Sequence, residues 1–555
     1  MQRKPGILMG AFIGGLLMIP VIAISFLGQQ VAGFPFIPSI LFGFGRDNAP
    51  GDLVPRTIQL MSDTIISLNI GRVDVVAKQV EFFLEWTTLL VLGIVAGAIF
   101  FAVLSRLQKA RNDTFPGIGL GLIVALIVLG MMATLPYISS ADPAVAIVWI
   151  AILLIVWGMA MGSVYHTLAY RTTTADGADA QSSAQVIDRR QFLVRVGAAS
   201  ATITVVGAGL GALLNQREEG STELLAQPDS TPSVEMASLP NADDPVTPAP
   251  GTRLEVTPLE DHYRIDITTV PPRVEPEGYV LPFVSALTED GSVQTIAELT
   301  LDDIRGYESR EDYITMSCIS NRVAGDLIST IKWTGVSMQA LLADIDIPEG
   351  ATHIKITAAD GFDETIALAL IEEDERVMLA YEWEDQPLTV EHGFPLRIHI
   401  PNHFGMKQPK WITGMEFISG DEDGYWVRRG WDKQALVLAT SVIDTVATDS
   451  MFEGEDGEQM IPVGGIAWAG DRGLLRVEVK VDDGEWVETQ LRSPISDRTW
   501  QIWRYDWAFT EGTHTFEVRC YDSDASAQIA SSQGTFPSGA TGIHSIRATV
   551  EGASA

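Results

Sequence analysis

The chain has 555 residues, a formal net charge of −34 at pH 7 and only two cysteines. This length exceeds what one hydrophobic core can organise and indicates about three or four folding units. The acidic excess argues against nucleic acid or an anionic membrane surface as a partner, because both would repel the chain. Two cysteines are also too few to hold an iron–sulfur cluster.

Five apolar stretches in the first part of the chain are nearly free of charge and about long enough to cross a bilayer. They are Ile7 to Leu27, Trp86 to Leu104, Ile118 to Leu135, Val145 to Leu168 and Gly197 to Leu214. Within residues 52–80, between the first two, apolar side chains recur at helical spacing among polar ones: Ile58, Met61, Ile65 and Leu68. This pattern predicts an interfacial helix rather than a sixth span.

Basic residues predict the orientation of the spans, because lysine and arginine are retained on the cytoplasmic side. They precede the first span, follow the second and lie between the fourth and fifth: Arg3, Lys4, Arg106, Lys109, Arg111, Arg171, Arg189 and Arg190. The loop 138–143, after the third span, has none. We therefore expect a multi-pass protein of the cytoplasmic membrane, with its N-terminus inside and everything after Leu214 on the extracytoplasmic side.

The sequence DRRQFL at residues 188–193 precedes an apolar stretch rich in alanine and glycine. It resembles a twin-arginine export signal placed internally, and such signals are read by a receptor. Alternatively, the arginines are only the positive-inside cluster of the last span. The sequence leaves both interpretations open.

Three further segments follow residues 1–214, which we assign to the membrane anchor. Residues 215–251 are rich in Glu, Ser, Thr, Pro and Asp and predict a disordered linker. In residues 252–433, short strands such as His353 to Thr357 and Leu396 to Ile400 alternate with helices such as Ser337 to Ala343, which indicates an α+β domain. Residues 434–555 contain short alternating strands separated by turns, which is typical of an all-β sandwich.

Cys318 lies in the run TMSCISNR at residues 315–322, followed by GDLI at 325–328 and KWTGV at 332–336. These runs resemble the molybdenum-ligating segment of the sulfite oxidase family. A soft thiolate suits a metal that changes oxidation state while it exchanges an oxygen atom. A disulfide between Cys318 and Cys520 is the ordinary alternative for two cysteines in an exported domain, but the flanking motif favours the metal ligand. Cys520, within a predicted strand, is then expected to be a buried and unreactive thiol.

Two further runs, HGFPLR at 392–397 and GMKQPKW at 405–411, are similar to the same family in spacing. The resemblance implies that four of their residues grip the phosphate and pterin of molybdopterin: His392, Arg397, Lys407 and Lys410. A guanidinium fork and point charges suit a buried phosphate. The run HYRIDI at 262–267 resembles the family's entry segment and implies cofactor binding by Tyr263, Arg264 and Asp266. His392, Arg397, Lys407 or Lys410 taken alone would be interpreted as a surface charge, and only their combined spacing favours cofactor binding.

The sequence departs from sulfite oxidases at two positions. Val323 stands where they have an arginine five residues after the cysteine, and Trp431 stands where they have a tyrosine. Because a sulfite anion needs cations close to the metal, sulfite is not the expected default substrate. Arg322 and His403 are the cations that would compensate, and we assign Arg322 a catalytic role together with Cys318.

The resemblance implies a bacterial, membrane-anchored oxidoreductase that uses molybdenum–molybdopterin for two-electron oxygen-atom transfer on a small molecule. A sulfoxide reductase, similar to the methionine sulfoxide reductases that share the fold, is an alternative. So is a noncatalytic, membrane-tethered binding protein that keeps the fold.

The resemblance also bears on partners. His166 is the only histidine in the expected spans, which argues against an internal haem pair. Electrons would then leave through a separate partner, a cytochrome or a quinone-linked protein. The run GIAWAGDRG at 465–473, with Trp503 and Trp507, resembles the family's immunoglobulin-like dimerisation domain and implies a homodimer through the C-terminal domain.

Overall fold

The computed structural model describes residues 5–50, 53–106, 114–135, 142–171, 189–225, 239–288, 290–454 and 456–550. By its contacts the chain divides into a helical unit, Met1–Pro50 with Lys78–Gln227, and a β-rich unit, Gly51–Ala77 with Pro228–Ala555. Residues 51–77 therefore belong with the β-rich unit, although in the sequence they lie between two long apolar helices. Arg3 and Lys4, the first basic residues of the chain, and Asp188 of the twin-arginine-like run lie outside the described residues.

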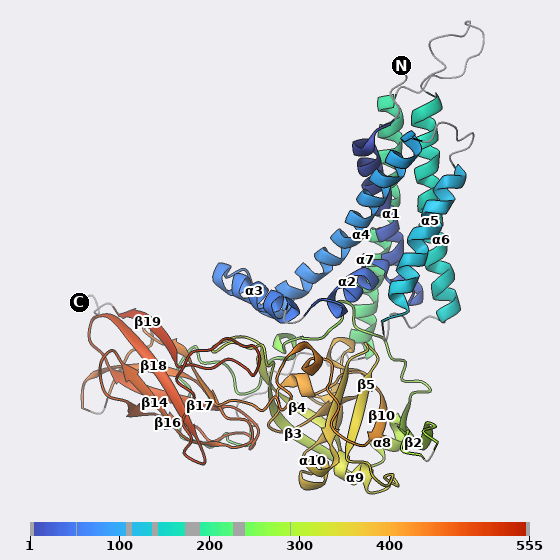
Figure 1. Ribbon diagram of the computed structural model, residues 1–555. Helices are drawn as coiled ribbons and strands as arrows, with labels where there is room; N and C mark the ends of the chain where they lie inside the picture. The colour runs from blue at the N-terminus through green and yellow to red at the C-terminus, as the bar shows by residue number, and fades with distance from the viewer. Residues whose placement is uncertain are drawn as a thin grey trace, which may run out of the picture. The chain divides into compact units, whose positions relative to one another are not determined.

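The helical unit is built almost entirely from helices (Figure 1). They are α1 (Ile7–Ala32), α2 (Ile37–Asp47), α4 (Val73–Arg106), α5 (Thr114–Met132), α6 (Pro143–His166) with the π-helical turn η1 (Thr167–Arg171), and α7 (Arg189–Leu225). Five of the described helices are long and apolar enough to cross a membrane, and each contains or overlaps one of the five predicted spans. The predicted helices are confirmed. That they cross a membrane, and in which direction, remains a prediction.

Small residues let these helices approach closely. A Cβ atom on Gly97 would lie 2.4 Å from the carbonyl oxygen of Gly10, and one on Gly158 would lie 2.3 Å from that of Gly117. Either atom would clash with backbone, so glycine is required where α1 meets α4 and where α5 meets α6. Close backbone contact through small residues is the usual way in which apolar helices pack without a hydrophobic driving force between them.

α3 (Leu53–Leu68) is the helix that the sequence predicts between the first two spans. Its packed side carries Ile65, which lies in an apolar cluster of the β-rich unit, and Met61, which packs against that cluster. Leu60 and Leu68 are exposed by 67% and 62%. Leu68 therefore does not pack on the β-rich unit as Ile65 does. The location of α3 at a membrane interface stays a prediction.

The central region of the β-rich unit, residues 252–433, contains two sheets. The first has the order β2-β1-β10-β5-β6 and the second the order β3-β4-β7-β8, with β9 on β7. The strands are β1 (Val280–Ser285), β2 (Gln294–Thr300), β3 (Ser309–Ser317), β4 (Ile328–Ser337), β5 (His353–Ala358), β6 (Asp363–Ala367), β7 (Met378–Trp383), β8 (Gln386–Pro387), β9 (Arg397–His399) and β10 (Ile412–Ile418). Among them only β1 and β10 pair in parallel, with Phe283 opposite Met415.

Short helices complete this region. They are α8 (Leu301–Arg305), α9 (Met338–Leu342), α10 (Leu368–Glu373) and the 3-10 turns η4 (Leu259–Asp261), η5 (Val390–His392), η6 (Gly405–Lys407) and η7 (Val427–Arg429). One apolar core joins both sheets to these helices, with Leu281, Leu341, Ile356, Leu379 and Ile398 among its members. The strands expected near residues 353 and 396 and the helix expected near residue 337 are present as β5, β9 and α9.

The C-terminal region, residues 434–550, is formed by two antiparallel sheets. β11 (Thr440–Val446), β13 (Gln459–Trp468), β17 (Gln501–Ala508) and β16 (Gln490–Leu491) form one, with β12 (Phe452–Glu453) on β13. β15 (Val487–Glu488), β14 (Leu474–Val481), β18 (Gly512–Asp522) and β19 (His544–Val550) form the other. Ile461 and Trp503 of the first sheet share a core with Val477, Val518 and Cys520 of the second, as expected of a sandwich.

Part of the segment predicted as a disordered linker has a defined structure. α7 continues to Leu225, and residues 239–251 pack on the C-terminal region. Asn241 donates to the Ser493 carbonyl at 2.6 Å, and Arg492 donates to the Val246 carbonyl at 2.8 Å. Low hydrophobicity predicts disorder because it provides little apolar area to bury, but here side-chain bonds from a buried arginine hold the backbone instead.

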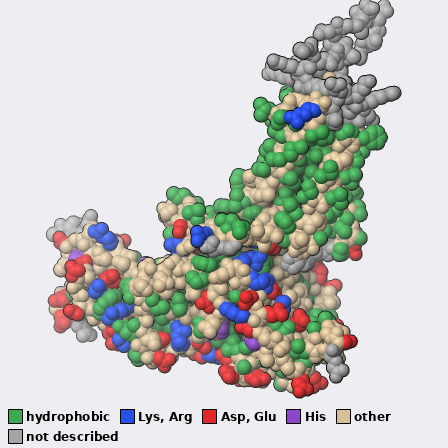
Figure 2. All heavy atoms as spheres, in the orientation of Figure 1, with side chains coloured by type: hydrophobic (Ala, Val, Ile, Leu, Met, Phe, Trp, Pro, Cys, Tyr) green, Lys and Arg blue, Asp and Glu red, His purple; other side chains and the backbone are tan. Residues whose placement is uncertain are grey.

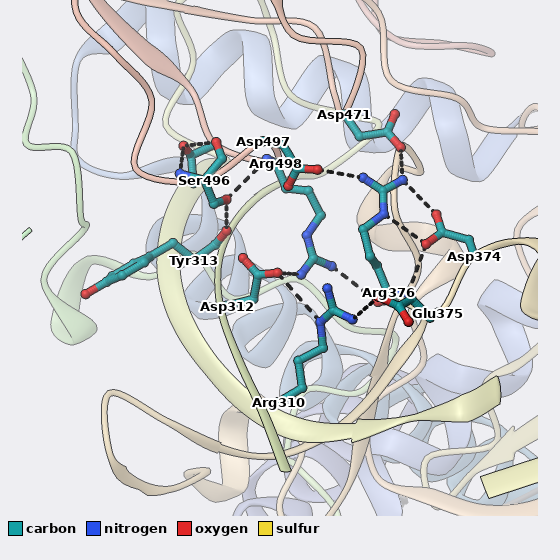
Figure 3. A network of polar contacts seen from close by, with 11 residues as sticks. Arg310, Asp312, Tyr313, Asp374, Glu375, Arg376, Asp471, Ser496, Asp497 and Arg498 are labelled. Atoms are coloured by element: carbon teal, nitrogen blue, oxygen red, sulfur yellow. Dashed lines mark hydrogen bonds and ion pairs between the residues drawn. The ribbon is translucent and has the colours of Figure 1, made fainter. Parts of the chain in front are cut away.

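Arginines join the two β regions to each other (Figure 3). Arg376 of the central region bonds Asp374 beside it and reaches Asp471 and Asp497 of the C-terminal region at 2.7 and 3.0 Å. Arg498 of the C-terminal region forms an ion pair with Asp312 of the central region. Networks of this kind resist separation better than single surface pairs do. In the view of Figure 2, hydrophobic side chains predominate over the helical unit, and Asp and Glu gather over the β-rich unit.

Candidate functional site

Cys318 follows directly after β3, in a loop that returns to the sheet through β4. The backbone N–H of Cys318 donates to the Leu327 carbonyl at 3.0 Å, and the Asn321 side chain accepts from the N–H of Leu327 at the same distance. A Cβ atom on Gly325 would lie 2.4 Å from the Asn321 side-chain oxygen, so a larger residue there would displace the amide that holds this turn. The loop thereby fixes where the thiol lies.

The Cys318 thiol is buried, and its Sγ lies 3.0 Å from the Ser320 hydroxyl oxygen. Burial raises its pKa above the ordinary value, although the bond from Ser320 opposes this effect. A thiol of this kind is inert until a cation stabilises the thiolate. Both cysteines are free, so the disulfide alternative is wrong. Cys520 is fully buried in β18, as expected of an unreactive thiol.

Arg397, in β9, carries the least compensated charge of the site. Its side chain donates to the His392 carbonyl at 3.0 Å, and its guanidinium lies 4.7 Å from the centre of the Trp333 ring. Its Nε has no hydrogen-bond partner, and within the described residues no carboxylate forms an ion pair with it. Burial accordingly lowers its pKa to about 10.

Three histidines lie near this arginine: His262 and His399 are buried, and His392 is partly buried. The rings of His262 and His392 lie 4.9 Å apart, and His399 lies 4.3 Å from Trp333. Burial, together with the positive charges of Arg397 and Lys410, lowers the pKa of His262 and His392 well below the ordinary value. Burial and Arg397 do the same for His399. All three rings are therefore neutral at pH 7, and each can donate one hydrogen bond and accept another.

The residues of the expected entry segment meet the second basic run. Lys410 donates to Asp266 at 3.2 Å and to the Glu391 carbonyl at 2.9 Å, and Arg264 donates to the same carboxylate at 2.8 Å. Burial lowers the pKa of Lys410 to about 8, an effect that Asp266 opposes. Tyr263 is buried, which raises the pKa of its phenol above the ordinary value, so the hydroxyl stays protonated.

Lys407 is held elsewhere. It donates to Glu364 at 2.6 Å, and both side chains are almost completely buried. Burial raises the pKa of Glu364, although Lys407 opposes the effect. The structure thus joins Tyr263, His392, Arg397 and Lys410 through shared neighbours, and it places Lys407 on a carboxylate of its own.

Arg322, four residues after Cys318, forms an ion pair with Asp63 of α3. Val323 beside it is half-buried. Trp431 is buried in an apolar cluster with Ile319, the residue that follows the cysteine, and its ring meets Phe536 at 5.2 Å. The position therefore serves packing in this chain.

Several residues of the site were not predicted from the sequence. The sequence does contain a signal for His399, because strand residues two apart point to the same side and His399 follows Arg397 at that interval. His262 was noted only as a replaced aromatic residue. Trp333 and Trp383 belong to ordinary strand patterns that give no signal of a polar site. The contribution of Asp63 comes from a distant segment, which no local motif could reveal.

The donor set fits a molybdopterin. Arg397 Nε and the Nε1 atoms of Trp333 and Trp383 are buried and unpartnered, whereas buried donors in proteins are nearly always bonded. Among the described residues, no group of three or more His, Cys, Asp or Glu could hold a metal ion. A metal bound through the single Cys318 thiolate would thus have to arrive with further ligands, which a pterin dithiolene supplies.

Residues 269–426 match the family model described as an oxidoreductase molybdopterin binding domain. Mitochondrial sulfite oxidase of Mus musculus is 28% identical over 341 residues, which are 51% of this chain and 61% of the mouse protein. The chain therefore contains a molybdopterin-binding oxidoreductase domain and is similar to sulfite oxidases. The resemblance inferred from the Cys318, His392 and Gly405 runs is therefore confirmed, and molybdenum–molybdopterin is the cofactor of the family's oxidoreductase domain.

Two other proteins are less similar to this chain. Sulfite oxidase of Arabidopsis thaliana is 24% identical, with 56% of this chain and 91% of that protein aligned. The sulfane dehydrogenase SoxCD from Paracoccus pantotrophus is a structural neighbour with a TM-score of 0.45 and 16% identity, over 56% of this chain and 89% of that one. This chain spans less than two thirds of the mouse protein's length.

Proposed function

We propose that this chain is a membrane-anchored molybdopterin oxidoreductase that catalyses two-electron oxygen-atom transfer on a small molecule, with Cys318 as the protein ligand of molybdenum. The observation that carries this proposal is Arg397, buried without a carboxylate beside unpartnered tryptophan donors. A buried cation with no counter-ion is costly unless an anion binds there. When bound, the cofactor supplies the metal that exchanges an oxygen atom and takes up or releases the electrons.

The residues of the chain have separate roles in this proposal. Arg397 would hold the cofactor's phosphate or pterin, because its rigid guanidinium fork offers directional N–H donors. Neutral His392 and protonated Tyr263 provide hydrogen bonds without adding charge. Lys410 adds a point charge that Asp266, itself bonded to Arg264, holds in place. Lys407, bonded to Glu364, supports the 3-10 turn η6 and would reach the cofactor only by leaving that carboxylate.

Molybdenum analysis of the purified full-length protein tests this assignment. We expect about one molybdenum per chain in the native protein, since one site binds one cofactor, and a loss of most of it in Arg397→Met. Arg428→Met is a matched control, because Arg428 pairs with Asp363 on a half-exposed surface. Native protein free of molybdenum and pterin would contradict the enzyme and favour the noncatalytic binding protein.

A sulfoxide reductase is the second candidate. Val323 and Trp431 replace two polar groups, and the remaining cation of the cysteine loop, Arg322, is already paired with Asp63. These features favour an uncharged substrate over an oxyanion. Turnover of dimethyl sulfoxide with a reduced dye, compared with turnover of sulfite with an oxidised dye, decides between the two directions.

The anchor and the partners are part of the same proposal. Five apolar helices support membrane anchoring, and the positive-inside pattern places the β-rich unit on the extracytoplasmic side. Electrons would pass to a separate cytochrome or quinone-linked protein. The two-sheet C-terminal region is proposed to be the immunoglobulin-like domain through which two chains dimerise.

Export is tested by replacing Arg189 and Arg190 together with lysine. The replacement keeps the positive charge that the positive-inside rule reads but removes the arginine pair that an export receptor reads. We expect the β-rich unit to become protected from protease added to intact cells. Unchanged cleavage would show that the arginines act only on topology.

A further inference from the structure

The loop that carries Cys318 contains a single cation. From Cys318 to Ile331 the only basic residue is Arg322, because the family's second arginine position is occupied by Val323. Any electrostatic attraction of an anionic substrate by this loop must therefore come from Arg322. What neutralises Arg322 decides how strong that attraction is.

A carboxylate from outside the central region neutralises it. Asp63 of α3 forms an ion pair with Arg322, although the two residues are separated in sequence by most of the helical unit. Both side chains are partly accessible, with 43% and 34% exposure. The pair therefore lies at the surface of the cysteine loop, where an incoming solute would meet it.

The backbone around Asp63 is held firmly on this face. Two residues after it, Ile65 is buried in the apolar cluster that contains Tyr263 and Cys318. Further along, the N–H of Val73 donates to Asp326 of the same cysteine loop at 2.9 Å. The carboxylate is thus delivered to Arg322 by a packed element and not by a loose chain end.

The segment between α3 and α4 is also bonded to the entry run. Arg72 pairs with Asp261 at 2.9 Å, and Asp74 accepts from the backbone N–H of Arg264 at the same distance. Residues 53–77 therefore contact both sequence runs that border the proposed metal site. They form a cap, and Asp63 is the residue of the cap that carries charge to the cysteine loop.

We propose that Asp63 is a specificity-determining residue, which pairs with Arg322 and so disfavours dianionic oxyanions relative to uncharged oxygen-atom donors or acceptors. This inference rests on the proposed function for its meaning in catalysis, but the charge pairing itself is independent of turnover. A carboxylate next to the cation cancels most of its attraction for a dianion, whereas an uncharged sulfoxide feels little difference.

Sulfate binding to the full-length protein provides a direct test, because sulfate is a dianion that does not react. We expect Asp63→Asn to tighten the dissociation constant for sulfate about tenfold by titration calorimetry, which corresponds to about 1.4 kcal/mol. Asp63→Glu should bind sulfate as the native protein does. Asp261→Asn is the control, since it removes an equal charge next to the cap, where Asp261 pairs with Arg72 and not with Arg322.

The double variant Asp63→Asn with Arg322→Met completes a double-mutant cycle for the ion pair. Its sulfate affinity should return to about the native value, and Arg322→Met alone should change that affinity less than about threefold, because the cation is already neutralised in the native protein. If Asp63→Asn does not fold, a large loss of sulfate affinity in Arg322→Met alone would overturn the proposal. So would unchanged affinity in Asp63→Asn, or equal tightening in Asp261→Asn.

Turnover adds the catalytic half of the test. The ratio of sulfite to dimethyl sulfoxide turnover should rise about tenfold in Asp63→Asn, in parallel with the affinity. An unchanged ratio in an active variant would overturn the specificity role. If the native protein turns over neither substrate and contains no molybdenum, the proposed function fails, whereas the sulfate titrations still decide whether Asp63 masks Arg322.

Discussion

Arg397 in the central region and Arg492 in the C-terminal region are both 4% exposed, yet their surroundings differ completely. Arg492 forms an ion pair with Glu255 at 3.1 Å and donates to the carbonyls of Val246 and Asn241 at 2.8 and 3.0 Å. Arg397 donates to one carbonyl and lies over a tryptophan ring, and its Nε has no hydrogen-bond partner.

The difference separates a structural arginine from a binding one. A folded chain satisfies a buried guanidinium when its only task is to join segments, as Arg492 joins residues 239–255 to the C-terminal sheets. A guanidinium left with unused donors is stable only if a ligand completes it. Burial alone does not distinguish the two regions, whereas the balance of partners does.

Replacing each arginine by methionine tests this comparison directly and should give the largest effect. Arg492→Met leaves Glu255 buried without its cation, so we expect it to destabilise the fold by about 3 to 5 kcal/mol. In cofactor-free protein, Arg397→Met should cost less than about 1.5 kcal/mol, because it replaces an uncompensated charge by an apolar side chain. Thermal unfolding of both variants, prepared without cofactor, is the measurement. Equal destabilisation would remove the distinction.

The two cysteines extend the comparison to the same regions. Cys318→Ser should lower turnover at least about a hundredfold while the fold is retained, because a hydroxyl is a harder and weaker ligand than a thiolate. Cys520 packs in the sandwich core with Val518 and Trp503, so Cys520→Ser should leave turnover per folded molecule unchanged. Activity normalised to folded protein separates the outcomes, and parallel losses in both variants would contradict the assignment of Cys318.

The sequence predicts the site better than it predicts the partners of the site. The runs around Cys318, His392 and Lys410 predict a cofactor site, because such a site needs a few residue types at fixed spacing within one loop. Lys407 belongs to the same run, but its pairing with Glu364 depends on strand β6, which no local pattern connects to it. Local motifs report what a loop contains and not what packs against it.

The same limit applies to the larger elements. Apolar length predicted the five long helices, because a long run of apolar side chains has few other folds available. Helical spacing predicted α3, but the face that it covers depends on long-range contacts such as that of Ile65 with the Cys318 cluster. Polar composition predicted disorder at residues 239–251, where Arg492 instead supplies the bonds that order the backbone.

Restoring the two missing polar groups should sharpen the contrast between the site and its packing. In Val323→Arg with Trp431→Tyr, sulfite oxidation should rise about tenfold, since one well-placed charge-stabilising donor is typically worth that much or more. The gain is limited because Trp431 also packs on Ile319 and Phe536. Sulfite turnover under saturating artificial acceptor is the measurement, with Trp431→Tyr alone as the control for packing. Fast sulfite oxidation by the native chain would contradict our interpretation of both positions.

The smallest expected effect concerns the neutral histidines beside Arg397. The unfolded chain takes up a proton on each histidine as the pH falls through about 6.5, but burial and Arg397 hold the native pKa of His399 well below that value. The unfolded state then binds more protons than the native state, so His399 makes the protein less stable as the pH falls. Asp360 acts in the opposite direction, because burial raises its pKa to about 6 and the native state takes up that proton. Asp360 is present in both proteins to be compared, so its contribution cancels.

Between pH 7.5 and 5.5, His399→Asn should therefore lose about 1.4 kcal/mol less stability than the native protein, which is the free energy that corresponds to one pKa unit. The apparent Tm at the two pH values measures this difference. An unchanged pH dependence would show that His399 has the same pKa in the native and unfolded states, and a greater loss of stability in His399→Asn would show that His399 is protonated in the native site.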